Sequence, residues 1–439
     1  MKKEHIVKTL KRNFCLISVV VVLILAGCSG ARVMMPTPNV YLDPQRDYFA
    51  DLAQGLKSTE VPLFYITDRA PEKDQKGNLR YGYQRSASVG FGTAVVDLGE
   101  NITWEELLEA SRTQKRLKPV NLKLRDVEEI VRAPDTPLPF REVDGKIIEE
   151  PALVEQREAA AEAFRRVIVR QLELTPRKEI FVFVHGFHNS FDDAAFAMAE
   201  LRHFLGRIGI PIVYTWPAVH PGIFGYTYDR ESSDLTIYHL RQVLAAIAKF
   251  PEVEKIHLIA HSRGTDVAVA AVRELTMMAR AAGINPREKF KLHNIILAAP
   301  DLDLQVATQR ILGDKLGLSA HRTTIYTSPK DKAIGIASKL FASPRGRLGT
   351  FGQDQLTGLT GASIEYGTSN FSFVRFSGVG DQGDRYGHSY FRDAPTVASD
   401  VVLTLRDDYD PGTSGRPLEP TGPHFWQVPP GYPAVVSSQ

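Results

Sequence analysis

The chain has 439 residues, of which 43% are hydrophobic and 24% are charged, and its formal net charge at pH 7 is +2. This is ordinary globular composition with ample material for a core, and it excludes a low-complexity chain. The near balance of charges gives no reason to expect a strongly basic surface or a nucleic-acid partner.

The first 27 residues have the pattern of an export signal. Five Lys or Arg residues open the chain, and an apolar stretch from Phe14 to Ala26 follows, too short to span a bilayer comfortably. The Leu-Ala-Gly-Cys that ends it resembles the lipobox of bacterial lipoproteins. That resemblance implies that Cys28 becomes the lipidated N-terminus, and Ser29 implies sorting to the outer membrane. An uncleaved N-terminal anchor is the alternative, and both interpretations place the remaining chain outside the cytoplasm.

Removal of residues 1–27 changes the charge and cysteine content. It leaves 48 Lys or Arg and 50 Asp or Glu, a formal net charge of −2. Cys15 would leave with the signal and Cys28 would be acylated, so no disulfide can form in the exported chain. We therefore expect a protein that depends on its core for stability and contacts the membrane through its N-terminal lipid.

The N-terminal part after the signal is less regular. Residues 28–60 are polar and contain proline, which predicts a tether. Two β-rich segments predict strands, at Val61–Thr67 and Ala87–Leu98. Two longer segments have helical periodicity, at Thr103–Leu122 and Leu153–Leu174. The stretch 126–150, between the two predicted helices, is rich in proline and charge, which predicts an excursion of the chain over the surface. Residues 61–178 thus form N-terminal strands with a charged helical extension.

From residue 179 onward, short apolar runs alternate with helical patterns. The runs are 179–184, 210–217, 255–262, 290–301, 323–331 and 371–377. The helical patterns are Ala194–Ile208, Ser232–Lys249, Thr265–Ala282 and Thr396–Leu405. Runs that are apolar on both faces suit a buried parallel sheet. The pattern predicts a doubly wound, mostly parallel α/β core over 179–408, followed by a Pro-rich C-terminal tail over 409–439.

Ser262 lies at the end of the third apolar run, directly before a predicted helix, in Ala260-His261-Ser262-Arg263-Gly264. Small residues two positions before and after a serine are typical of a nucleophile elbow, with Ala260 in the place of the usual first glycine. The alternative is a serine that caps a helix N-terminus.

A serine nucleophile needs a base and an orienting acid. In a sheet of this type their order is serine, acid, histidine. Asp331 follows the fifth apolar run and His388 follows the sixth, so we predict Ser262 as nucleophile, His388 as general base and Asp331 as orienting carboxylate. Asp301 and Asp303, after the fourth run, remain alternative acids.

An acyl-transfer site also needs amide donors for an oxyanion. The amide of Arg263 directly follows the nucleophile, and Phe187 lies in the His185-Gly186 loop after the first core run. We predict these two amides as the oxyanion hole. A tight glycine turn with no charge to stabilise is the alternative interpretation of this loop.

Several short motifs occur together in a fixed order. They are "FYITDR" (64–69), "VHGF" (184–187), "YTWP" (214–217), "AHSRG" (260–264), "APDLD" (299–303), "YTSPKD" (326–331) and "HSYF" (388–391). Over roughly 60–405 the set resembles a bacterial α/β-hydrolase family of largely unassigned, esterase- or lipase-like function. The resemblance implies the α/β-hydrolase fold and a Ser-Asp-His triad, and it says little about substrate.

We therefore expect an envelope-anchored serine hydrolase that cleaves a carboxylic ester, whether of a small molecule or a lipid. Amide hydrolysis by the same groups is a second possibility. The alternative is a non-catalytic lipoprotein of the same fold that binds lipid, glycan or a protein. No metal or cofactor is expected, because the sequence has no Walker motif, no His-Glu-x-x-His and no cysteine cluster. Residues 221–228 and 342–367 are candidate pocket or lid segments.

Overall fold

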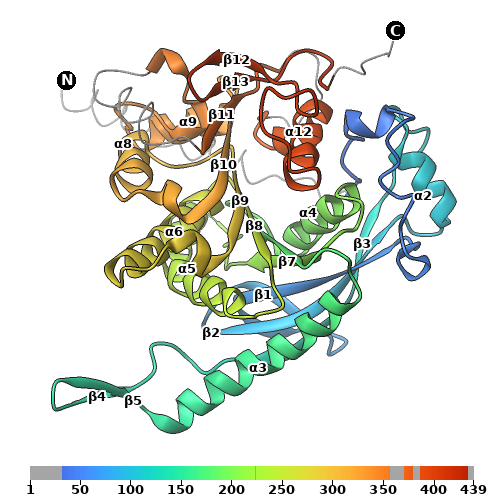
Figure 1. Ribbon diagram of the computed structural model, residues 1–439. Coiled ribbons are helices and arrows are strands. Elements are labelled where there is room, and N and C mark those ends of the chain that lie inside the picture. The colour runs from blue at the N-terminus through green and yellow to red at the C-terminus, as the bar shows by residue number, and fades with distance from the viewer. Residues whose placement is uncertain (1–31, 223, 356–369, 379–385, 434–439) are drawn as a thin grey trace, which may run out of the picture.

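The structure is a computed structural model, and it describes residues 32–222, 224–355, 370–378 and 386–433. Its centre is an eleven-stranded sheet (Figure 1). In sheet order the strands are β12 (Glu419–Gly422), β13 (Phe425–Gln427), β11 (Phe371–Arg375), β10 (Ala320–Thr327), β9 (Leu292–Ala298), β8 (Lys255–His261), β6 (Glu179–Val184), β7 (Ile210–Thr215), β1 (Glu60–Lys73), β2 (Leu79–Leu98) and β3 (Leu122–Arg132). A separate hairpin pairs β4 (Phe140–Val143) with β5 (Lys146–Glu149).

The middle of the sheet is parallel, and this confirms the doubly wound α/β prediction. Strands β11, β10, β9, β8, β6, β7 and β1 pair in parallel, whereas β2, β3 and β12 are antiparallel to their neighbours. Every residue of β6 and β7 is buried, as expected for strands covered on both faces.

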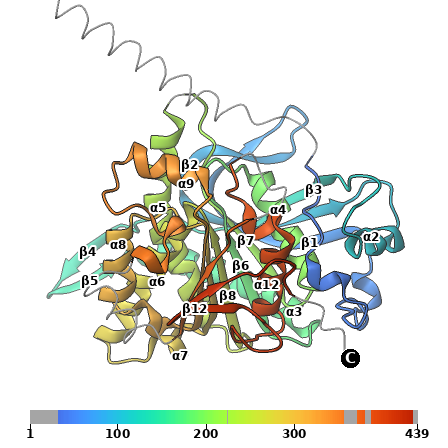
Figure 2. The ribbon, with the colours of Figure 1, turned by 90° about the horizontal axis from the view of Figure 1, so that it is seen from above.

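Helices cover both faces of the sheet (Figures 1 and 2). One face packs against α3 (Pro151–Glu173), α5 (Gly225–Ala248) and α6 (Gly264–Ala281). The other packs against α4 (Phe191–Phe204) and α12 (Pro395–Leu405). The shorter helices are α2 (Trp104–Ser111), α7 (Pro286–Phe290), α8 (Leu304–Ala307), α9 (Lys332–Leu340) and α11 (Tyr390–Asp393). No helix of the described ranges combines the length and apolarity needed to cross a membrane.

The direction of winding reverses beside β6. Strand β6 is followed by α4, on one face, and its neighbour β8 is followed by α6, on the other. The loops that leave the carboxyl ends of these two strands therefore diverge, and a crevice opens between them. Both sequence motifs with the greatest chemical interest, residues 185–190 and Ser262, lie at this reversal.

Residues 32–60 do not form the tether that the sequence predicts. Met34 is 2% exposed, and the Met35 amide donates to the buried carboxylate of Glu200 at 2.6 Å. Val40, Tyr41 and Phe49 are also buried in the core on the α4 and α12 side. The segment has no regular period because it packs as extended chain and short 3-10 turns (Asn39–Leu42 and Gln54–Leu56).

The C-terminal segment also belongs to the fold. Strand β13 pairs in parallel with β11. Asp400 of α12 binds two side chains from the segment after residue 408, where the predicted core ends. The Arg416 guanidinium donates to the Asp400 carboxylate at 2.9 and 2.8 Å, and the Tyr432 hydroxyl donates at 2.5 Å. This fully buried ion pair fixes a stretch that composition alone marked as a tail.

The boundary near residue 178 is not a domain boundary, because β1 pairs directly with β7.

The prediction of a helix over 103–122 is wrong beyond α2. Thr103 begins α2 with a capping box, and α2 ends at Ser111. Pro119 cannot lie inside a helix, and β3 begins shortly after it, at Leu122. Part of the predicted surface excursion over 126–150 is therefore strand, and the rest carries the exposed β4–β5 hairpin. The helix over 153–174 is confirmed as α3.

Candidate active site

Ser262 occupies a sharp turn between β8 and α6. Its φ is +53°, a region that non-glycine residues seldom adopt, and its side chain is nearly buried. The flanking glycines are required by space: a Cβ on Gly264 would lie 2.2 Å from the His185 carbonyl oxygen, and one on Gly186 would lie 2.7 Å from the Ser262 Cβ. The turn therefore holds a strained serine against the loop after β6.

The three residues predicted as a triad lie together. The Ser262 Oγ is 2.7 Å from the His388 Nε2, and the His388 Nδ1 is 2.7 Å from the Asp331 Oδ2. The Asp331 side chain has no exposed surface and caps α9 by accepting from the Ile334 amide at 3.0 Å. With the Nδ1 proton donated to the carboxylate, the Nε2 is left to accept the serine proton.

The two alternative acids have other partners, although Asp301 lines the same cavity as Ser262 and His388. The Asp301 carboxylate forms a buried ion pair with the Arg347 guanidinium. The Asp303 carboxylate caps α8 and accepts from the amides of Gln305 and Val306 at 2.9 and 3.3 Å. Neither carboxylate contacts His388, so the geometry selects Asp331 of the three candidates.

His185 is a packing residue. Its ring stacks on Trp216 at a centroid distance of 4.9 Å, its Nδ1 lies 2.8 Å from the Gly186 carbonyl, and its Nε2 accepts from the Trp216 amide at 3.0 Å. Burial, and then the Arg69 charge, hold the pKa of His185 well below its ordinary value. The imidazole is therefore a neutral brace between the loops after β6 and β7.

The two amides predicted as an oxyanion hole flank Ser262. Gly186 packs on the Ser262 Cβ, which brings the Phe187 loop against the nucleophile turn, and Arg263 is the next residue along the chain. Between described residues, neither the Arg263 amide nor the Phe187 amide donates a hydrogen bond. Both amides are thus without an acceptor among the described residues, and their role as an oxyanion hole stays a prediction.

Two buried charged residues tie down this loop, and sequence reasoning missed their role. Asp229 of α5 is 1% exposed and accepts from the amides of His188, Val219 and His220 at 3.3, 3.1 and 3.3 Å. His188 and Val219 both have positive φ, at +55° and +72°. A carboxylate that accepts three amides thus holds two strained loops in place.

Arg69 of β1 ties the same loops from the other side. Its Nη2 donates to the Asn189 carbonyl at 2.8 Å, its Nε to the Thr215 hydroxyl at 2.9 Å, and its Nη1 to the Gly82 carbonyl at 2.7 Å. Burial lowers the pKa of Arg69 to about 10. The motif "FYITDR" contains this residue, but its contacts with Asn189 and Thr215 lie more than a hundred residues further along the chain, so the sequence alone shows no reason for the arginine.

A cavity of about 240 Å³ opens beside Ser262 and His388. Much of its wall is apolar and comes from α9 and from two aromatic residues: Ala333, Ile334, Ile336, Ala337, Leu340, Phe187 and Tyr226. Gly222 and Tyr226 belong to the segment 221–228 that the sequence proposed as a pocket wall. Part of the second proposed segment, 342–367, lies outside the described residues.

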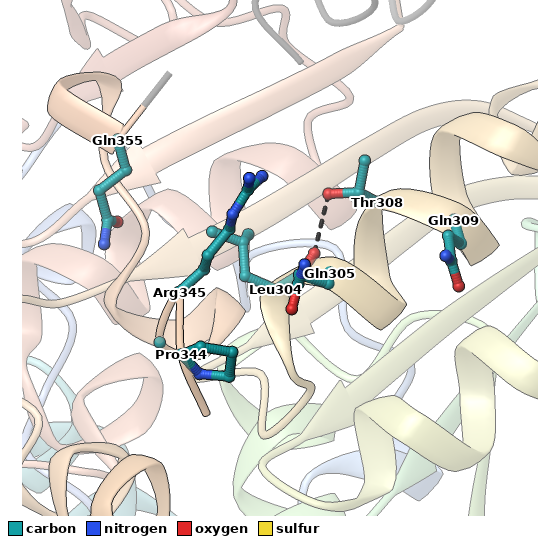
Figure 3. A pocket seen from close by; sticks show the side chains of 8 residues that line it. Leu304, Gln305, Thr308, Gln309, Pro344, Arg345 and Gln355 are labelled. Carbon is teal, nitrogen blue, oxygen red and sulfur yellow. Dashed lines mark hydrogen bonds between the residues drawn. The ribbon is translucent and has the colours of Figure 1, made fainter. Parts of the chain in front are cut away.

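A larger cavity of about 650 Å³ lies away from Ser262. Leu304, Gln305, Thr308 and Gln309 line one side of it, and Pro344 and Arg345 line the facing side (Figure 3). None of the predicted catalytic or oxyanion-hole residues lines it, although Pro344 and Arg345 belong to the proposed segment 342–367. No group of three or more potential metal ligands occurs among the residues that the structure describes. Cys28 lies outside the described residues.

Comparison with known proteins gives one family match. Residues 160–406, more than half of the chain, match the family described as α/β-hydrolase of unknown function. A protein from Thermoplasma acidophilum described as a CIB-like hydrolase is 16% identical, with a TM-score of 0.31, over 61% of this chain and 97% of its own. A Lactobacillus plantarum protein described as a cell surface hydrolase is 10% identical, with a TM-score of 0.29, over 53% and 92%. Similarity at this structural level assigns no function, and no curated protein matches the sequence.

Proposed function

The chain belongs to this α/β-hydrolase family of unknown function, and we propose that it is a serine hydrolase that cleaves carboxylic esters through an acyl-enzyme. The observation that carries the proposal is the unbroken chain of short contacts from Ser262 through His388 to Asp331, each at 2.7 Å. A strained serine at the end of such a chain is the arrangement that activates a hydroxyl as a nucleophile.

Acylation would proceed as follows. The Ser262 Oγ attacks the carbonyl carbon of the ester while the His388 Nε2 takes the hydroxyl proton. The carbonyl oxygen becomes an oxyanion and accepts from the Arg263 and Phe187 amides. The carbon–oxygen bond to the leaving alcohol then breaks, and His388 returns the proton to the alkoxide. Asp331 holds the imidazole in the required tautomer throughout.

Deacylation would repeat the same steps with water. His388 takes a proton from a water molecule, the hydroxide attacks the acyl carbon, and the bond to the Ser262 Oγ breaks as His388 protonates it. No metal or organic cofactor takes part in either half. Asp229 and Arg69 act as positioning residues, because they hold the loop that presents the Phe187 amide.

The cavity supports an ester with an apolar acyl group. Its apolar wall lies directly beside Ser262, and a volume of about 240 Å³ suits an acyl chain of short to medium length. Amide bonds use the same chemistry but have a poorer leaving group. We therefore propose esters as the substrates and treat amide cleavage as an outcome of the test.

The test is hydrolysis of 4-nitrophenyl esters of increasing acyl length by the purified full chain. Ser262→Ala should lower kcat by roughly 10⁴-fold or more while leaving the unfolding temperature unchanged. Ser58→Ala, a serine that precedes β1, is the matched control and should keep wild-type turnover. Wild-type turnover in folded Ser262→Ala would refute the mechanism. No activity on any ester or anilide in the wild type would favour a binding protein of the same fold.

We further propose that the protein is anchored to the bacterial envelope through a lipid on Cys28, with the outer membrane as its destination. The support is the sequence before Cys28 and the position of Met34, which is already buried in the fold. Only a few residues separate the two, so the folded part would lie against the membrane surface. Labelling with radioactive palmitate in a bacterial host should mark the wild type and fail in Cys28→Ala. Equal labelling of both would contradict the anchor.

A further inference from the structure

A second cavity, of about 370 Å³, adjoins the ester pocket and differs from it in character. Four arginines line it: Arg230 of α5, Arg263 beside the nucleophile, and Arg310 and Arg347 from the segments after β9 and α9. The ester pocket is mostly apolar, so two unlike compartments flank one serine.

Two aromatic rings separate the compartments. Tyr226 lines both cavities, and its ring lies 5.1 Å from that of Phe341. Leu340 lines the ester pocket while the next residue, Phe341, lines the arginine cavity. The guanidinium carbons of Arg230 and Arg347 lie 5.5 and 5.4 Å from the Phe341 ring centroid. Tyr226 is therefore part of the wall that the ester pocket and the arginine cavity share.

Four carboxylates, those of Asp234, Asp266, Asp301 and Asp303, match the four arginines in number but are unevenly paired with them. Asp266 is shared by two cations, at 2.8 Å from Arg263 and 2.5 Å from Arg310. Arg347 pairs with Asp301. Within the described ranges Arg230 forms no ion pair.

Two more carboxylates line the cavity, those of Asp234 and Asp303. The Asp303 carboxylate is engaged by the amide groups at the start of α8. An arginine without an ion pair, next to two arginines that share one carboxylate, leaves guanidinium donors for an incoming anion.

The Tyr226 hydroxyl adds a further unused donor. Its oxygen is buried and has no hydrogen-bond partner among the described residues. A buried hydroxyl without a partner is costly, and because Tyr226 lines both cavities, a ligand that reaches its hydroxyl would supply that partner. Burial, and then the Asp301 charge, raise the pKa of Tyr226 to about 12, so the phenol keeps its proton and can donate it in a hydrogen bond.

We propose that the arginine cavity binds an anionic group, a phosphate or a carboxylate, on the alcohol part of the substrate. This inference rests on the proposed function. The acyl group fills the apolar pocket, the scissile carbonyl lies at Ser262, and the anion lies past Tyr226 among the arginines. The substrate class is thus an acyl ester whose alcohol carries a negative charge.

The first experiment compares three aryl butyrates that share one leaving-group framework: 4-butyryloxyphenyl phosphate, 4-butyryloxybenzoate and the neutral methyl 4-butyryloxybenzoate. The wild type should show at least a tenfold higher kcat/KM for one of the anionic esters than for the neutral ester. The better anionic ester identifies phosphate or carboxylate. Arg310→Gln and Arg230→Gln should each reduce that ratio severalfold. Arg280→Gln, an exposed arginine near the end of α6, is the matched control and should keep the wild-type ratio.

The outcomes separate the two claims. Ser262-dependent hydrolysis of the neutral ester with no anionic preference would overturn the cavity's assignment and leave the hydrolase standing. A second readout needs no turnover: calorimetric binding of 4-hydroxyphenyl phosphate and 4-hydroxybenzoate to Ser262→Ala. We expect one of them to bind, and to bind about tenfold more weakly when Arg310→Gln is added. Absence of binding by both, or affinities indifferent to Arg310, would overturn the proposal even if no ester is cleaved.

Discussion

Two chains of hydroxyl, imidazole and carboxylate occur among the residues that the structure describes, and only one of these two has the surroundings of a candidate catalytic site. In the first, Ser262, His388 and Asp331 are joined by two contacts of 2.7 Å. In the second, the Thr136 hydroxyl lies 2.8 Å from the His239 Nε2, and the His239 Nδ1 lies 3.0 Å from the Asp68 Oδ2. Each borders a cavity, of about 240 Å³ and about 140 Å³ respectively.

The difference lies in what else each group contacts. The Thr136 hydroxyl also lies 2.9 Å from the Ala87 carbonyl, to which it can donate, and Asp68 accepts from the hydroxyls of Tyr214 and Thr236 as well. Thr136 is not among the residues of positive φ, whereas Ser262 has a φ of +53° and is flanked by two amides with no partner in the described chain. A relay of three side chains is therefore insufficient: the positive-φ turn and the amide donors distinguish the candidate site from a structural network.

The largest loss of activity that would test this contrast is expected from a substitution of Asp331, the carboxylate of the first chain. Asp331→Asn should lower kcat by roughly 10³- to 10⁴-fold with little change in stability, because the amide favours the wrong imidazole tautomer. Asp303→Asn, at the alternative acid, should cost less than tenfold. Steady-state kinetics with thermal unfolding of both variants checks this, and a larger loss in Asp303→Asn would reverse the assignment.

The next effect concerns the loop that presents the Phe187 amide. Asp229→Asn replaces one carboxylate oxygen with an NH₂ group, which cannot accept from the amides of His188 and Val219 or, in the other orientation, from that of His220, so the loop should shift. We expect kcat to fall about 10²-fold with a smaller change in KM, as for loss of one oxyanion donor. Fluorophosphonate labelling should slow in parallel. If only the unfolding temperature changes, Asp229 supports the fold and not the site.

The second relay should behave in the opposite way. Thr136→Val removes the hydroxyl and keeps the shape, leaving the His239 Nε2 without that partner. We expect wild-type kcat and KM, and a loss of about 1 kcal/mol in the free energy of unfolding. Chemical denaturation and ester hydrolysis measure the two quantities. A large loss of activity at unchanged stability would mean that the second relay takes part in catalysis.

Glu200 is a third buried carboxylate, and unlike Asp331 and Asp68 it is paired with an arginine and not with a histidine. It contacts Arg32 at 3.1 Å, and burial raises its pKa to about 7. Between the unfolded pKa near 4.5 and about 7, the folded chain keeps a proton that the unfolded chain loses, so stability falls as pH rises through this window. Glu200→Gln should remove that slope. Unfolding temperatures of both proteins from pH 4.5 to 8 test it, and parallel curves would contradict it.

The sequence was sufficient for the parts of the molecule whose signals are local. The six core strands, the four core helices and α3 follow from apolar runs and helical periodicity. The Ser262 turn follows from small residues around one serine at a strand end. The order serine, acid, histidine then leads to Asp331 and His388, and the structure brings those two side chains to Ser262.

Other features depend on contacts that no local pattern records. The Asn39 side chain donates to the Tyr432 carbonyl across 393 residues of sequence, and both segments had the composition of a linker or tail. Asp229 and Arg69 are polar residues within a helix and a strand, and only the folded chain shows that they hold the loop after β6. The Tyr226 hydroxyl and the arginines around it are likewise assembled from distant segments.

The measurement that tests the central claim most directly is peptide mapping of the purified full chain after reaction with a fluorophosphonate. Such a probe reacts with an activated serine whatever the natural substrate. We predict a single adduct, on Ser262, that is absent in Ser262→Ala and strongly slowed in His388→Ala. An adduct on another residue, or no adduct on well-folded protein, would contradict the assignment of Ser262 as the nucleophile.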